Sequence, residues 1–175
     1  FPLQDMTLYT FHWSELGNYI MLGLLCAAAG VSFIWLLNLI ENAFERLRLS
    51  QAVKPLIGGL VLGVVGLVTM VVFHGAARGE PVIFGKGYAF IGLCIGTARA
   101  ERFADFELTM GILFVLMAAK MVGTALTLGS GGSGGVFAPS LFMGATLGYG
   151  FGLTMQQWGW SMDVNPATYS LVGMA

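Results

Sequence analysis

The chain has 175 residues, of which 57% are hydrophobic and 10% are charged, whereas a soluble globular domain carries about 25% charged residues. The mean hydropathy of +0.80 excludes an ordinary soluble domain, because a chain of this length does not make a core large enough for so much apolar surface. A bilayer is the better solvent. The net charge of −1 and the isoelectric point near 6.1 argue against a nucleic-acid partner.

Six helical segments are expected along the chain, in an all-α membrane protein with about four full spans, one short helix and one truncated helix. Their approximate bounds are 14–49, 55–76, 88–97, 107–128, 136–156 and 166–175. No secretory signal pattern opens the chain, and the last helix is cut off at Ala175. We therefore expect residues 1–175 to be a single transmembrane segment of a larger, multi-pass integral membrane protein, in the cell membrane if the source is prokaryotic.

The first two segments have the features of membrane spans. Leu16 to Ile40 is free of charge, and its roughly 25 residues suffice to cross a hydrocarbon layer of about 30 Å. Charges follow only at the end of this helix, which predicts a helix end in water. Pro55 opens the second span, where a missing N–H does no harm. Gly59 and Gly63 then have the GxxxG spacing that lets helices approach closely in lipid, so tight packing is expected at this pair.

Neither a metal site nor a cofactor site is expected. Cys26 and Cys94 lie in apolar runs and are interpreted as reduced packing residues. His12 has no Cys or His partner at the spacing of metal ligands.

Lys120 lies about halfway along the apolar segment 107–128, where a lone charge is costly. Three interpretations stay open. The side chain snorkels to the interface, pairs within the helix bundle, or faces an aqueous path and attracts anions electrostatically.

A glycine-rich turn, Gly129 to Gly135, leads into the helix that begins near Val136. Its glycines match the dinucleotide fingerprint GxGxxG, but no strand precedes them and no βαβ unit surrounds them, so a nucleotide site is rejected. A purely structural turn would lie at the surface. The stretch from Met121 to Met162 contains no charged residue, which predicts that the turn lies within the membrane depth.

The start of the helix near Val136 has the electrostatics of an anion site. First-turn N–H groups lack partners, and the helix dipole places about half a positive charge there. An anion satisfies both. Phe137 would form an apolar wall, and Pro139 stands where its missing N–H does no harm. With no full positive charge in the motif, a bound ion can also leave, and a halide fits better than phosphate.

The residues from Gly134 to Pro139 resemble the GxFxP signature of the ClC chloride channels and chloride/proton exchangers. The Gly/Ser-rich turn before them, the glycine-faced helix after them and the basic residue of the preceding helix, Lys120, are similar to that family as well. The resemblance covers nearly the whole chain. It implies a partial ClC chloride channel fold, from the second half of an inverted repeat, with tilted, short and broken helices.

The same resemblance implies a site and a function. The anion would be bound by Gly135, Val136 and Phe137. The residues that would support the motif are Gly131, Ser133, Gly134, Ala138 and Pro139. The implied function is transmembrane chloride transport, by voltage-gated channel conduction or by antiport with protons, and not an enzymatic reaction. The implied partners are chloride, protons in the case of exchange, the lipid bilayer, and a second copy in a homodimer formed mostly outside this segment.

Several alternatives remain at this stage. The family's gating glutamate, its serine-bearing pore turn and its late tyrosine do not occur here, so channel and exchanger stay equally open. A non-conducting scaffold subunit would use the glycine turn only to pack helices. A transporter of another small anion, coupled to a cation and built on a broken helix, would be favoured by an acidic residue within the spans, and the spans contain none.

Overall fold

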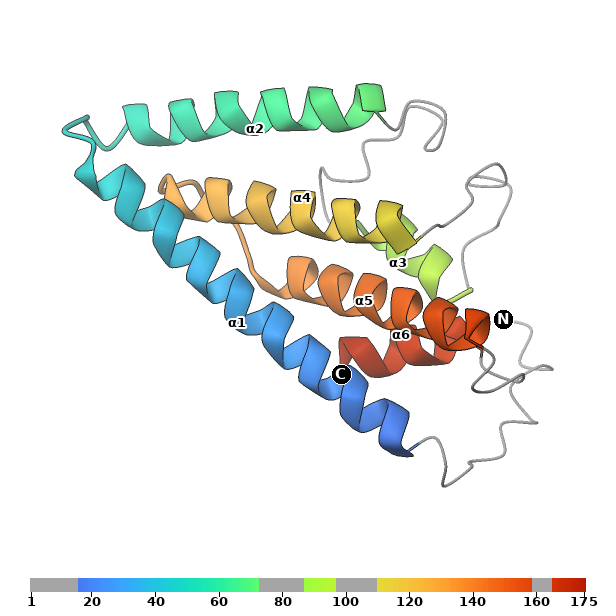
Figure 1. Ribbon diagram of the computed structural model, residues 1–175. Helices are drawn as coiled ribbons and strands as arrows, with labels where there is room; N and C mark the ends of the chain where they lie inside the picture. The colour runs from blue at the N-terminus through green and yellow to red at the C-terminus, as the bar shows by residue number, and fades with distance from the viewer. Residues whose placement is uncertain (1–15, 73–86, 97–109, 159–164) are drawn as a thin grey trace.

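The computed structural model describes residues 16–72, 87–96, 110–158 and 165–175. These residues form an all-α structure of six helices (Figure 1). The helices are α1 (Leu16–Arg46), α2 (Val53–Val72), α3 (Tyr88–Cys94), α4 (Met110–Gly129), α5 (Phe137–Gln157) and α6 (Pro166–Met174). Each expected segment overlaps one of them. α1 ends three residues before its expected end at 49, and α2 begins two residues before its expected start at 55. α4 and α5 each end one residue beyond their expected ends. His12 lies outside the described residues.

Among the described residues, three helices are long and apolar enough to cross a membrane, namely α1, α2 and α4. Of the expected four or so full spans, three are therefore supported by length and composition among these residues. The remaining long helix, α5, has 21 residues but lower hydropathy, because glycines occupy four of its positions. These are Gly144, Gly148, Gly150 and Gly152.

The glycine face of α5 is covered by α6, which runs antiparallel along it (Figure 1). A Cβ placed at Gly144 would overlap the backbone of Gly173, and one at Gly148 would overlap the carbonyl oxygen of Tyr169. The two backbones approach this closely because side chains are missing at the contact. This pair is the most extensive helix–helix contact in the described structure.

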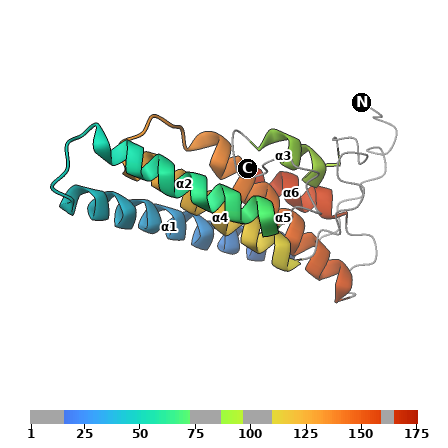
Figure 2. The same ribbon diagram turned by 90° about the horizontal axis from the view of Figure 1, so that it is seen from above.

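The buried side chains lie where α4 and α5 meet their neighbours. One group joins α3, α4 and α5 and consists of Phe90, Ile91, Cys94, Leu113, Leu116, Phe142 and Ala145. A second joins α1, α5 and α6, and a third joins α1, α4 and α5. Figure 2 shows α3 beside α6. Cys94 is buried without a disulfide, which agrees with a packing role.

The apolar surfaces of α1 and α2 remain largely exposed. In an apolar 18-residue stretch of each of these two helices only 11% is buried, whereas in the corresponding stretch of α4 the buried share is 44%. Exposed side chains such as Leu24, Ile34 and Leu60 would be unfavourable in water but are suited to lipid. α4 and α5 therefore form the interior of the described structure, with α1 and α2 at its lipid-compatible edge.

Candidate functional site

α4 ends at Gly129, and the chain turns back on that helix before α5 begins. The N–H groups of Gly131 and Gly132 donate to the carbonyl oxygens of Leu128 and Thr127, both at 2.9 Å. Gly131 has a φ of +87°, a region that glycine enters readily and other residues rarely do. The first half of the turn is thus fixed by backbone hydrogen bonds and by one glycine with an unusual conformation.

The N-terminus of α5 follows at Val136, whose backbone angles are φ −90° and ψ −20°. No side chain of the described residues caps this end. Helix geometry leaves the N–H groups of Val136, Phe137 and Ala138 without an intrahelical acceptor, and Pro139 has no N–H. The N–H of Ser140 closes the first turn by donating to the carbonyl of Val136 at 2.9 Å. Three amide donors and the positive end of the helix dipole are therefore gathered at one point.

The motif faces outward from the described helices. Val136 is 50% exposed and Phe137 71%, and Gly134 and Gly135 before them are exposed as well. A Cβ at Gly135 would meet nothing within 4 Å, so packing among the described residues does not require a glycine there. By contrast, Ala138 is half-buried and Pro139 is buried. Val136 and Phe137 are thus exposed, and the backbone directly after them is anchored by the buried Pro139.

Lys120 is in the interior, with 4% of its surface exposed. Its Nζ lies 5.6 Å from the centroid of the Phe142 ring. This contact matches pairing within the bundle, one of the three open interpretations, and does not match snorkelling to the interface. Phe142 lies about 7.5 Å further along the α5 axis than Phe137. An electrostatic effect of Lys120 on anions stays a prediction.

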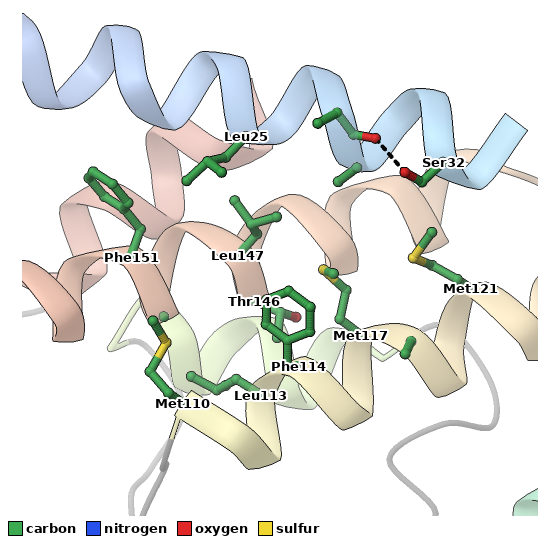
Figure 3. A pocket seen from close by; sticks show the side chains of 14 residues that line it. Leu25, Ser32, Met110, Leu113, Phe114, Met117, Met121, Thr146, Leu147 and Phe151 are labelled. Atoms are coloured by element: carbon green, nitrogen blue, oxygen red, sulfur yellow. Dashed lines mark hydrogen bonds between the residues drawn. The ribbon is translucent and has the colours of Figure 1, made fainter. Parts of the chain in front are cut away.

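A groove of about 410 Å³ lies between α1, α4 and α5 (Figure 3). Apolar side chains line it, with Met110, Met117 and Met121 among them. Its two hydroxyl groups, on Ser32 and Thr146, each donate to a carbonyl of their own helix. The groove lining offers an ion neither a charge nor an uncommitted donor, so the candidate anion site is the start of α5.

The expected packing at Gly59 and Gly63 is absent from the described structure, because a Cβ at either position would meet nothing within 4 Å. The neighbouring Gly58 packs instead, against Ser130 at the end of α4. The GxxxG spacing correctly predicted that α2 packs closely against another helix. However, α2 is rotated so that Gly58 faces the end of α4, and not Gly59 or Gly63. Sequence spacing alone contains no signal for that rotation.

Residues 2–175 match the family model described as voltage gated chloride channel. The chain belongs to this family. Channels and exchangers of the ClC type are integral membrane proteins and not enzymes, which agrees with the three membrane-length helices.

Similar curated proteins include both exchangers and channels. An H(+)/Cl(−) exchange transporter ClcA of Vibrio cholerae is 29% identical over 162 residues, covering 92% of this chain and 31% of the relative. A voltage-gated ClC-type chloride channel ClcB of Citrobacter koseri is 28% identical over 174 residues, covering 96% and 37%. A ClcA of Yersinia pestis is 33% identical over 157 residues, covering 89% and 29%. The ClC chain described here spans about a third of the length of these relatives. Among solved structures, none gives a significant match.

Proposed function

We propose that the full-length protein moves chloride across a membrane, by channel conduction or by chloride/proton exchange. The anion is held at the N-terminus of α5 by the amides of Val136 and Phe137, with Gly135 keeping the approach free. The described helices belong to the second half of an inverted repeat in the ClC fold, and the remaining walls of the pore come from outside this segment. A homodimer forms mostly through helices outside it.

The uncapped start of α5 is the observation that carries this proposal. Its three unpartnered N–H groups need an acceptor in a membrane interior, where an unsatisfied backbone group costs several kcal/mol. A halide supplies that acceptor without a proton and without a fork of charged side chains. Phe137, at 71% exposure, stands beside these amides as an apolar wall that excludes water from the bound ion.

Chloride efflux from liposomes tests the proposal, with extravesicular pH recorded at the same time. The full-length protein is compared with Phe137→Ala, Gly135→Val and Pro139→Ala. We expect Phe137→Ala to change the halide selectivity or the rate with little loss of folded protein, because this side chain packs little in the described structure. Gly135→Val should have a larger effect than Pro139→Ala, since a branched Cβ obstructs the approach whereas Pro139 offers the ion no N–H.

A matched control is Phe114→Ala on α4, another phenylalanine with a large exposed fraction of 63%. It should retain wild-type selectivity. Chloride loss with opposite proton movement identifies an exchanger, and chloride loss without it identifies a channel. Equal flux and selectivity in all three site variants would refute the site. Absence of chloride movement in the wild type would favour the scaffold alternative.

A further inference from the structure

Gly129, the last residue of α4, and Ser130, which follows it, each pack against another helix. A Cβ at Gly129 would lie 2.9 Å from the backbone nitrogen of Glu41 in α1, which is closer than van der Waals contact allows. The Cγ2 of Ile40 lies at the same distance from that position. The end of α4 therefore rests directly on the α1 backbone, at the point where charged residues begin to appear in α1.

Ser130 packs against the first turns of α2, and the exposed Gly131 lies near them. Ser130 is 3% exposed, and its Oγ and Cβ occupy the space that a side chain at Gly58 would need. A Cβ at Gly131 would lie 4.0 Å from the Cγ of Pro55. Pro55 and Gly58 are three residues apart and thus share one face of α2. This face contacts the turn at Ser130, the residue that directly follows α4, and passes near Gly131.

Ser130 is linked to the rest of the turn through a hydrogen-bond acceptor that it shares with Gly132. The hydroxyl of Ser130 donates to the carbonyl oxygen of Thr127 at 3.2 Å. The N–H of Gly132 donates to the same oxygen at 2.9 Å. A displacement of Ser130 therefore disturbs the acceptor that holds Gly132, which is the last residue of the turn with a hydrogen bond back to α4 among the described residues.

We propose that Gly58 is a positioning residue for the anion site. Because Gly58 has no side chain, Ser130 packs directly against α2. This contact fixes the position of the turn and, through the turn, the positions of Val136 and Phe137. A methyl group at position 58 forces Ser130 away from α2 and shifts the amides that follow. This inference rests on the proposed function of the α5 N-terminus, and it adds a determinant of anion selectivity on a helix that contributes no group to the site.

A double-mutant cycle in the full-length protein tests this role. Gly58→Ala is compared with Gly59→Ala, a neighbour with nothing within 4 Å of its Cβ position. The measurement is the bromide-to-chloride flux ratio in liposomes, taken only from monodisperse protein. Gly58→Ala should shift the ratio and lower the rate by about tenfold or more, since misplacement of about an ångström at a site can reduce a rate up to about a hundredfold. Gly59→Ala should match the wild type.

Rescue separates positioning from general damage. Ser130→Gly removes the two atoms that lie closest to the new methyl group and leaves the carbonyl oxygen of Leu126 at 3.2 Å from it. Gly58→Ala/Ser130→Gly should therefore have a ratio close to that of Ser130→Gly alone. If Gly58→Ala does not fold, Ser130→Cys enlarges the same contact from the other side and should shift the ratio in the same direction. A folded Gly58→Ala or Ser130→Cys with the wild-type ratio would overturn the inference.

The experiments distinguish failure of the proposed anion site from failure of the positioning role of Gly58. If Phe137→Ala changes the ratio while Gly58→Ala does not, the site stands and the positioning role is wrong. If neither Phe137→Ala nor Gly135→Val changes the ratio or the rate, the anion site itself is wrong. A shift in Gly58→Ala would then reflect another part of the pore, and the inference would be rejected with the site.

Discussion

The ammonium of Lys120 lies 5.6 Å from the centroid of the Phe142 ring, in the interior between α4 and α5. A buried cation over an aromatic face gains about 2 kcal/mol or more when it is desolvated. This contact offsets part of the cost of a lysine in the middle of an apolar helix. The charged group of Lys120 therefore contacts α5 beyond its first turn, whereas the candidate site lies in that first turn.

We therefore expect Lys120→Met to fold and to keep the bromide-to-chloride ratio of the wild type. The two side chains are of similar length, and the substitution removes the desolvation cost of the charge together with its contact with Phe142. Liposome flux and the thermal unfolding midpoint in detergent provide the measurements. A matched control is Lys54→Met, a half-buried lysine near the start of α2. If Lys120→Met shifts the ratio as far as Phe137→Ala does, Lys120 acts on the anion directly.

The contact between α5 and α6 predicts a strong size limit at Gly148. A methyl group there would overlap the carbonyl oxygen of Tyr169, so Gly148→Ala must separate the two backbones. We expect a loss of about 3 kcal/mol or more in the free energy of unfolding, at the upper end of overpacking effects. The control is Gly23→Ala on α1, where nothing lies within 4 Å and alanine is the better helix former by about 1 kcal/mol. Equal unfolding midpoints for the two variants would contradict this packing.

The positive φ of Gly131 predicts an order among substitutions at that position. A Cβ there has no close neighbour, with Pro55 Cγ at 4.0 Å, so the cost is conformational rather than steric. Gly131→Ala should lower the free energy of unfolding by about 1–2 kcal/mol, and Gly131→Asn by less, because asparagine enters the left-handed region more readily. Chemical denaturation followed by tryptophan fluorescence measures both. An asparagine variant less stable than the alanine variant would contradict the observed turn.

Ser170 forms a buried hydrogen bond between α6 and α5, with its hydroxyl donating to the carbonyl oxygen of Ala145 at 3.0 Å. Ser170→Ala should cost about 0.6 kcal/mol, the average for interhelical hydrogen bonds in a membrane protein. Ser32→Ala is the control, because the Ser32 hydroxyl donates only to Ala28 within its own helix. A comparable loss in both variants would show that the interhelical bond adds nothing specific.

The sequence predicts much of the local structure around the candidate site. Pro139 and the end of the glycine run place the start of α5, and the spacing of Gly144 and Gly148 predicts the glycine face that α6 covers. These features depend on residues close together in the chain, where conformational preference and helical periodicity are decisive. The residues proposed to hold the anion stay a prediction.

Long-range relationships could not be predicted in the same way. Which glycine of α2 meets α4 depends on the rotation of one helix against another, so Gly58 was missed in favour of Gly59 and Gly63. The surroundings of Lys120 depend on the packing of α5 across α4. The depth of the turn stays a prediction too, although its first residues lie beside Glu41, where the charged end of α1 begins.

The most direct measurement is the position of a bromide ion bound to the full-length protein, located by its anomalous X-ray scattering. The account predicts bromide within hydrogen-bonding distance of the backbone nitrogens of Val136 and Phe137. It also predicts that this peak is lost in Gly135→Val, in protein that remains folded. Bromide bound elsewhere, with none at the start of α5 in a protein that transports chloride, would contradict the account.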